Sequence, residues 1–322
     1  MDLSPDMDLE ESRLCVRVAK LYYEGELTQQ EIARKLGLSR IKVHRVLNRA
    51  RELGVVEIKI HAPPNSKFVE QEHLLTVAYD LRDAVVVQTP SAIEKLYVSL
   101  AQGAARWLAN RLEPGIRVGV GLGRTISHIP QFFSVDQQMD CTFMEVVGGS
   151  SENSGGFAKY NITSKLAEIA GGRAELLYAP NMVSSPELLR RLISEPGIAE
   201  ALERARHCDL ILQSVGTVDE TAILYVEDRI SLAELQDLQR SGAVGDALGQ
   251  YFDENGNPVS TFLDERVIGL NLADLKRTPW SVVVAGGEEK HHVVRAALKG
   301  GFFNALVTDI ETAKYLLSDY EG

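Results

Sequence analysis

The chain has 322 residues, of which 45% are hydrophobic and 25% charged, and its formal net charge is −11. This balance is typical of a globular protein, and no apolar run reaches the roughly 18 residues that a membrane-spanning helix needs. The acidic start, MDLSPDMDLEES, lacks the apolar segment of a secretory signal, and Cys15, Cys141 and Cys208 form no metal-ligand pattern. We therefore expect a cytoplasmic protein with no membrane contact, no metal site and no other cofactor.

Positive charge is concentrated near the start of the chain. Residues 1–62 hold 11 basic and 10 acidic side chains, whereas the rest of the chain holds 23 and 35. Seven lysines and arginines lie between Arg34 and Arg51, and no acidic residue lies among them. A solvated helix surface usually mixes charges of both signs, so a stretch of one sign favours contact with the phosphates of DNA.

The first predicted helix covers residues 11–23 and ends at Gly25. Its apolar residues recur at helical spacing and form one stripe: Leu14, Val18, Leu21 and Tyr22. A second helix follows Thr28, which forms the T-x-x-E pattern of a capping box with Glu31. The apolar stripe of this second helix consists of Ile32, Ala33 and Leu36.

A third predicted helix follows the turn at Gly37, is capped by Ser39 and runs to about Leu53. Its inner face is apolar: Val43, Val46, Leu47 and Ala50. This pattern predicts a helix–turn–helix whose third helix enters the major groove of DNA, and residues 55–63 alternate as the strand of a wing. The residues expected to contact DNA are Ser39, Arg40, Lys42, His44, Arg45 and Arg49. The alternative is a small helical domain whose charges are merely solvated.

Among these residues, position along the third helix separates two expected roles. Arg40, Lys42, His44 and Arg45 lie near the start of the helix and are placed to reach base edges. Arg49 lies further along and is expected to contact phosphates.

The composition predicts three segments along the chain. Residues 1–62 form the DNA-binding domain, and residues 63–82 form a linker that opens with Pro63-Pro64 and includes a helix over residues 68–81. Residues 83–322 alternate short apolar segments with helices. The segments expected to be strands are DAVVV, IRVGVGLG, CTFMEVVGG, AELLYAPN, CDLILQSVG, RVIGL, WSVVVAGG and ALVTD. Because each is apolar along its length, we expect an α/β sensor domain with a doubly wound, mainly parallel sheet.

Glycines follow several of these predicted strands, in residues 119–125, 146–152 and 284–290. Glycine allows the backbone to approach a ligand closely, and ligands of parallel sheets bind where strands end. Each loop alone could be an ordinary tight turn, but three at one sheet edge favour a crevice that binds an anion. Residues 241–259 are expected to form a glycine-rich loop, a strand, an ENGN turn and a returning segment. Asp246, in this stretch, either accepts hydrogen bonds from sugar hydroxyls or caps its own turn. His291 and His292 are adjacent on a helix and are expected to be solvated.

The order of the helix–turn–helix, LYAPNMVSS, GAVGD and the segment RVIGLNLADLKRTPWSVVVAGGEEKHHVVRAALKGGFFNALVTDIETAKYLL resembles the SorC family of bacterial sugar-responsive transcriptional regulators. The resemblance extends from about Val16 to Leu317. It implies a sensor domain similar to sugar-phosphate isomerases and deaminases, a phosphorylated sugar or polyol as effector, and a homotetramer bound to palindromic operator DNA.

The resemblance also implies which residues contact the effector: Gly123, Arg124, Thr125, Gly148, Gly149, Ser150, Asp246 and Lys290. The chain departs from the family pattern at Gly121-Leu122, where Ser followed by Trp or Gly is frequent. It departs again at Ser214-Val215-Gly216, where the family often has GIG. Both positions are expected to lie near the effector pocket.

These features predict a ligand-controlled transcription factor that is not an enzyme. The alternative from another class is a sugar-phosphate isomerase or deaminase fused to a DNA-binding segment, because Asp246 is a carboxylate in the region where such an enzyme needs a base. A purely architectural DNA-binding protein would leave the large second domain without a use.

Overall fold

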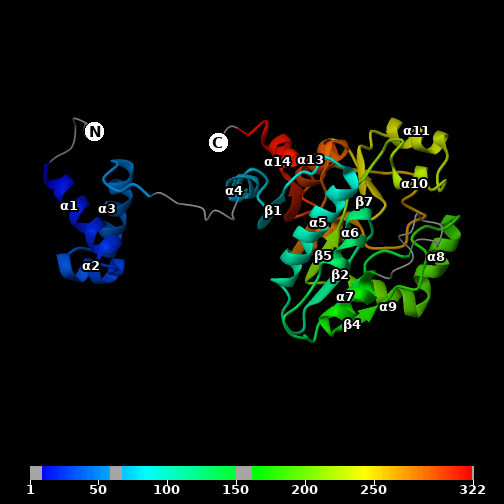
Figure 1. The fold of residues 1–322 in the computed structure, drawn as a ribbon, viewed down its shortest axis with the longest axis horizontal. Coiled ribbons are helices and arrows are strands. Elements are labelled where there is room, and N and C mark those ends of the chain that lie inside the picture. The colour runs from blue at the N-terminus through cyan, green and yellow to red at the C-terminus, as the bar shows by residue number, and fades with distance from the viewer. Residues whose placement is uncertain (1–8, 59–66, 150–161, 321–322) are drawn as a thin grey trace. The chain divides into compact units, whose positions relative to one another are not determined.

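The computed structural model describes residues 9–58, 67–149 and 162–320 (Figure 1). The chain divides into two compact units, residues 1–66 and 67–322. The predicted boundary between residues 62 and 63 lies outside the described residues. None of the helices within the described ranges is long and apolar enough to cross a membrane.

The first unit is helical, as predicted (Figure 1). Its elements are α1 (Leu9–Ala19), the π-helical turn η1 (Lys20–Glu24), α2 (Gln29–Leu36) and α3 (Arg40–Glu52). The capping box at the start of α2 is confirmed, since Glu31 N donates to Thr28 Oγ1 at 3.3 Å and Thr28 N donates to the Glu31 carboxylate at 2.8 Å. Gly37 has a φ of 66°, the left-handed conformation that the tight turn into α3 requires.

The core of the first unit is small and comes from all three helices. Its buried residues are Val18, Ile32, Ala33, Val43 and Leu47. The apolar stripes predicted from helical spacing therefore do face one another. The predicted wing strand finds no support in residues 55–58, which are not in a strand, and its remainder, residues 59–63, lies outside the described residues.

The second unit contains a seven-stranded, entirely parallel sheet with the order β1-β11-β10-β5-β2-β3-β4. The strands are β1 (Asp83–Val87), β2 (Arg117–Val120), β3 (Thr142–Glu145), β4 (Arg173–Glu175), β5 (Leu210–Gln213), β10 (Trp280–Val284) and β11 (Ala305–Asp309). The first strand, β1, lies at one edge of the sheet. The chain then builds β2, β3 and β4 toward the opposite edge, places β5 beside β2, and adds β10 and β11 back toward β1. The winding direction therefore changes between β2 and β5, which is where parallel sheets bind ligands.

Helices cover both faces of this sheet, because successive strand residues point to opposite sides. In β5, Leu210 and Leu212 pack on one face and Ile211 on the other. The first face is covered by α5 (Ile93–Ala109), α6 (Arg124–His128) with the 3₁₀ turn η2 (Ile129–Gln131), and α7 (Ile162–Ala170). The second face is covered by α4 (Val69–Ala78), α12 (Leu272–Arg277), α13 (His291–Lys299) and α14 (Ile310–Leu317). The doubly wound α/β fold is confirmed.

The helix α4, predicted as part of the linker, packs on the second unit. Val86 N of β1 donates to Glu72 Oε1 at 2.9 Å, and the Tyr79 hydroxyl at the end of α4 donates to the Leu316 carbonyl at 3.0 Å. Leu75 of α4 is fully buried in the core beneath β1 and α14. The helix therefore forms an integral part of the second unit.

A second, antiparallel sheet of four strands was not predicted in full. It consists of β6 (Gly216–Thr217), β7 (Gly245–Ala247), β8 (Gln250–Phe252) and β9 (Pro258–Val259). Four further helices, α8 (Pro186–Ser194), α9 (Pro196–Ala205), α10 (Ile223–Val226) and α11 (Leu232–Arg240), were not predicted. The prediction of a strand at RVIGL was wrong. That segment makes only isolated bridges, from Val267 to Met182 and from Gly269 to Val147.

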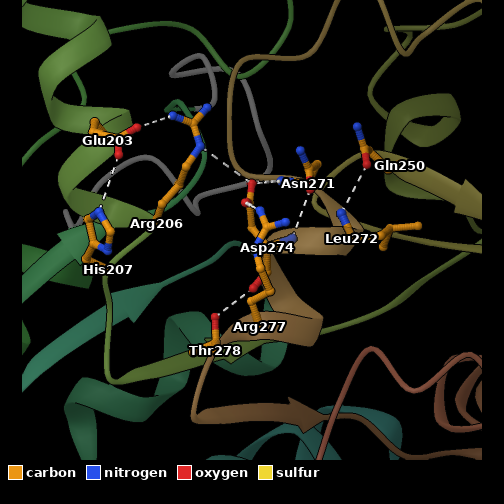
Figure 2. Close-up of polar contacts among 9 residues, drawn as sticks. All are labelled: Glu203, Arg206, His207, Gln250, Asn271, Leu272, Asp274, Arg277 and Thr278. Atoms are coloured by element: carbon orange, nitrogen blue, oxygen red, sulfur yellow. Dashed lines mark hydrogen bonds and ion pairs between the residues drawn. The ribbon is translucent and has the colours of Figure 1, made fainter.

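A polar cluster centred on Asp274 joins α12 to its surroundings (Figure 2). The Asp274 side chain is 2% exposed, accepts a hydrogen bond from Asn271 N at 3.0 Å and forms ion pairs with Arg277 and Arg206. Arg206 in turn pairs with Glu203 of α9 at 2.7 Å. One buried carboxylate therefore caps α12 and connects it to the end of α9.

We expect Asp274→Ala to lower the free energy of unfolding by about 2–3 kcal/mol, because the two ion pairs are lost and the partly buried N–H of Asn271 is left without its acceptor. Chemical denaturation of the full chain measures this change. The matched control is Asp237→Ala, which breaks an exposed ion pair with Arg240 and is expected to cost about 0.5 kcal/mol or less. Equal losses for the two variants would contradict the assigned role of Asp274.

Candidate functional site

The outer surface of α3 is the first candidate site. Val43, Leu47 and Ala50 point into the core, whereas Arg40, Lys42, His44 and Arg45 are exposed. The three cationic side chains of Arg40, Lys42 and Arg45 make no ion pair with any residue in 9–58. His44 Nε2 lies 3.2 Å from Asn48 Nδ2, one turn further along the same surface. The exposed side of α3 thus carries cations and hydrogen-bonding groups, which suits a polyanion.

Two of the predicted DNA contacts are already engaged within the protein. Ser39 accepts a hydrogen bond from Lys42 N at 3.1 Å and so caps α3. Arg49 pairs with Glu52 at 3.2 Å and with Glu11 at 3.6 Å. Arg49 therefore has its charge partly compensated, in contrast to Arg45.

The second candidate site is a cavity of about 530 Å³ in the second unit. It lies at the carboxyl ends of three adjacent strands of the parallel sheet, β2, β5 and β10. These strands lead into three loops that line it: residues 122–124, residues 214–217, and Glu289 with Lys290. The antiparallel sheet adds Asp246, Leu248 and Gly249. Two cations and several carboxylates thus share one cavity with an apolar wall.

Pairing of β6 with β7 positions Asp246. Gly216 lies directly opposite Asp246 in this antiparallel pair, and a Cβ on Gly216 would overlap Oδ1 of the carboxylate. The other carboxylate oxygen accepts a hydrogen bond from Gly249 N at 3.0 Å. Asp246 therefore does cap its local turn, and it also lines the cavity, so the two alternatives offered by the sequence coexist.

Burial shifts the pKa values of both Asp246 and Lys290. Burial raises the pKa of Asp246 to about 6, against the opposing effects of the Gly249 N–H and of Lys290. Burial also lowers the pKa of Lys290, and the nearby charge of Arg124 lowers it further, whereas Glu289 and Asp246 raise it. Both charged forms thus lack part of the solvation that water would give them, and a ligand of matching charge can supply it.

Gln213, the last residue of β5, forms hydrogen bonds with two of the cavity loops. Its Oε1 accepts a hydrogen bond from Leu122 N at 3.2 Å, and its Nε2 donates to the Ser214 carbonyl at 2.7 Å. A side chain on Gly121 would overlap Gln213, which explains why glycine stands there. Gln213 therefore fixes the loop after β2 against the loop after β5.

The structure brings together four of the eight residues predicted to contact the effector: Gly123, Arg124, Asp246 and Lys290 all line the cavity. Three others do not line it. Thr125 is 1% exposed and packs inside the protein, while Gly148 and Gly149 pair with the backbone of Ile268 and Ala179. Ser150 lies outside the described residues.

Several cavity residues were missed by sequence reasoning. They include Tyr97, Ser127, Asn181, Gln213, Thr221, Glu227 and Glu289. For Gln213 a signal existed, because it is a polar residue at the end of a buried apolar strand. The two departures from the family pattern do reach the cavity, through Leu122 and through Ser214 and Gly216.

Both units of the chain are similar to known proteins. A family model described as a sugar-binding domain matches residues 64–318, and a model of sigma-70 region 4 matches residues 13–52. The chain is 30% identical to the deoxyribonucleoside regulator of Bacillus subtilis, over 97% of this chain and 100% of that protein. It is 33% identical to the transcriptional regulator LsrR of an Enterobacter strain, over 96% of this chain and 94% of that protein.

A polyol regulator and a solved structure are similar over the same length. The erythritol catabolism regulatory protein EryD of Brucella abortus is 29% identical, over 96% of this chain and 98% of its own. The crystal structure of the full-length sorbitol operon regulator SorC from Klebsiella pneumoniae superposes with a TM-score of 0.73 at 28% identity, covering 96% of this chain and 99% of that one.

Proposed function

This chain belongs to the SorC family of sugar-binding transcriptional regulators, and we propose that a phosphorylated sugar or polyol controls its affinity for operator DNA. The observation that carries this proposal is the cavity in which Lys290 and Arg124 lie near Asp246. The two cations suit a phosphate, and the carboxylate suits the hydroxyls of a carbohydrate.

The phosphate of the effector is assigned to Arg124 and Lys290. A phosphate is largely dianionic at neutral pH and needs positive groups within a protein whose net charge is −11. Charge-assisted hydrogen bonds from lysine and arginine are the strong ones available in this cavity. Asp246 then accepts hydrogen bonds from effector hydroxyls, so the phosphate provides affinity and the carboxylate provides specificity.

Binding in the cavity alters DNA affinity only if the two ligand states of the protein contact DNA differently, and the coupling is then reciprocal. We further propose a homotetramer that acts in the cytoplasm on a palindromic operator. A two-fold site requires at least two copies of the DNA-binding unit, because each unit reads one half-site.

A sugar-phosphate isomerase or deaminase remains the second candidate, and one observation favours it. The pKa of Asp246, raised to about 6, is suited to a general base. A single set of measurements separates the two functions. Duplexes that bind the full chain are selected from a random pool, and a panel of phosphorylated sugars and polyols is then tested for release of the duplex and for chemical conversion.

Release or tightening of DNA by a phosphorylated compound, without conversion, supports the regulator. Conversion without any effect on DNA binding supports the enzyme. Equal responses to a phosphorylated compound and to its unphosphorylated parent would refute the proposed role of the phosphate.

Arg45→Ala is expected to weaken binding to the selected duplex by roughly 5-fold to 100-fold and to relax base preference at one position per half-site. Arg49→Ala is expected to flatten the salt dependence, because one phosphate contact is lost, and to weaken binding to all sequences. The factor should be smaller than for Arg45→Ala, because the ion pairs of Arg49 with Glu11 and Glu52 compete with phosphate. Anisotropy titrations at several salt concentrations measure both. Arg240→Ala, on the second unit, is the control. If Arg45→Ala left affinity unchanged, α3 would not be the reading helix.

A further inference from the structure

Ile41 is an apolar side chain that the first unit leaves in solvent. It is 74% exposed, whereas Val16, another exposed apolar residue of this unit, is 43% exposed. Ile41 is absent from the buried cluster that holds the three helices together. A single exposed apolar side chain is common on protein surfaces, so its position decides whether it has a role.

Ile41 lies on the side of α3 that faces directly away from the core. At 100° per residue, Ile41 is roughly 150° from the middle of the buried stripe of Val43, Leu47 and Ala50. Arg45 and Asn48, one and two turns further on, lie within about 40° of it. Ile41, Arg45 and Asn48 therefore form one outward row, which we call the reading row.

The neighbours of Ile41 on α3 are cationic, which indicates the kind of partner that contacts it. Arg40 and Lys42 flank it in sequence, and Arg45 follows one turn later; all three are exposed. An apolar patch framed by cations, and without acidic neighbours on α3 before Glu52, fits a polyanion that also presents an apolar group. Double-stranded DNA is such a partner, since the C5 methyl of thymine is the apolar group displayed in its major groove.

We propose that Ile41 is a specificity-determining residue that contacts the C5 methyl group of one thymine in each half-site. This inference rests on the proposed DNA-binding function and adds a base preference to it. Arg45 and Asn48 supply donors and acceptors to neighbouring base edges, and Ile41 supplies the apolar contact. Burial of one methyl group corresponds to about a fourfold change in affinity, so two half-sites give roughly fifteenfold.

The test uses the full chain and the duplex selected by it from a random pool. Each thymine is replaced in turn by deoxyuridine, which removes only the methyl group, and dissociation constants are measured for the wild type, for Ile41→Ala and for the control Val16→Ala. Both substituted residues are exposed, so neither variant is expected to unfold.

For the wild type and for Val16→Ala, we expect one symmetric thymine position at which deoxyuridine lowers affinity roughly fourfold per half-site. For Ile41→Ala, the same replacement should cause no further loss. The inference is overturned if every deoxyuridine leaves the wild type unaffected. It is also overturned if the sensitivity persists in Ile41→Ala, in which case the side chain faces solvent or a protein partner. Failure to select any duplex would overturn the DNA-binding function itself, which is a distinct result.

Discussion

Lys290→Ala should weaken binding of the phosphorylated effector by roughly 30-fold to 1,000-fold, because it removes a charge-assisted contact between the ammonium group and the phosphate. Lys290 is half-buried at the edge of the cavity, and its ammonium group makes no ion pair with any of the described residues. Effector-free binding to operator DNA should stay as it is in the wild type, since the reading row belongs to the other unit. Calorimetry with the effector and anisotropy with DNA measure the two properties separately.

Two controls make this result specific. Lys290→Met keeps most of the length and the apolar stem of the side chain, so it should lose effector binding as Lys290→Ala does. Lys299→Ala removes an exposed lysine at the end of α13 and should respond like the wild type. Burial lowers the pKa of Lys290, so its removal relieves a cost to the fold rather than adding one. If the DNA affinity of Lys290→Ala still changed with the same effector at the same concentration, the effector would bind elsewhere.

The helices of the first unit were predictable because their signals are local. Thr28 with Glu31, Gly37 and Ser39 each set a helix end through contacts within four residues. The order of helices and apolar strands in the second unit was predictable for a similar reason. Buried parallel strands are short apolar runs, and the repeated valines of DAVVV and WSVVVAGG favour strands over helices.

The antiparallel sheet was predicted only in part, as one strand and its return within residues 241–259, because its strands have two or three residues each. Such segments carry no usable period, and β6 pairs with β7 across some 30 residues of chain. The apolar sequence RVIGL predicts a strand, but in the structure Ile268 is buried in the core while its neighbours make only isolated bridges. An apolar segment therefore predicts burial of its side chains more reliably than it predicts that its backbone pairs in a sheet.

Three charged residues of the cavity were predictable, whereas Glu227, Glu289 and the uncharged wall residues were not. Arg124, Asp246 and Lys290 each follow a glycine-rich turn, a signal visible in sequence. Tyr97 of α5 and Thr221 approach the same cavity from helices and loops whose positions depend on the whole fold. Thr125 was expected to contact the effector but is buried in the core instead. It follows Arg124 in sequence, but one residue along a helix turns the side chain by about 100°, here into the core.

Asp246→Asn is expected to stabilise the effector-free protein and to abolish its effector response. The ionised carboxylate accepts hydrogen bonds from the effector, but its burial without effector lowers the free energy of unfolding. Burial raises the pKa of Asp246 to about 6, compared with 3.8 for an ordinary aspartate. The folded protein thus holds this proton more tightly than the unfolded chain. The contribution of Asp246 to stability is fully present below about pH 3.8 and is lost as the pH rises through about 6.

Above pH 7 the ionised carboxylate should lower the free energy of unfolding by about 1–3 kcal/mol, and asparagine avoids this loss. Asparagine still accepts the hydrogen bond from Gly249 N, so the turn is kept. Asp253 provides a control of opposite sign. Hydrogen bonds from Asn257 lower its pKa, so its ionised form supports the fold at neutral pH and Asp253→Asn should destabilise it.

Urea denaturation of the full chain between about pH 4 and 8 should reveal a gap between Asp246→Asn and the wild type that widens with pH and levels off above about pH 7. The measurement is made without effector, because the phosphate of the effector itself titrates near pH 6. Effector binding is then compared at pH 7.5, where the phosphate is mostly dianionic. A gap that did not change with pH would mean that Asp246 ionises normally in the folded protein. Stabilisation accompanied by an unchanged effector response would mean that the carboxylate lines the cavity without contacting the ligand.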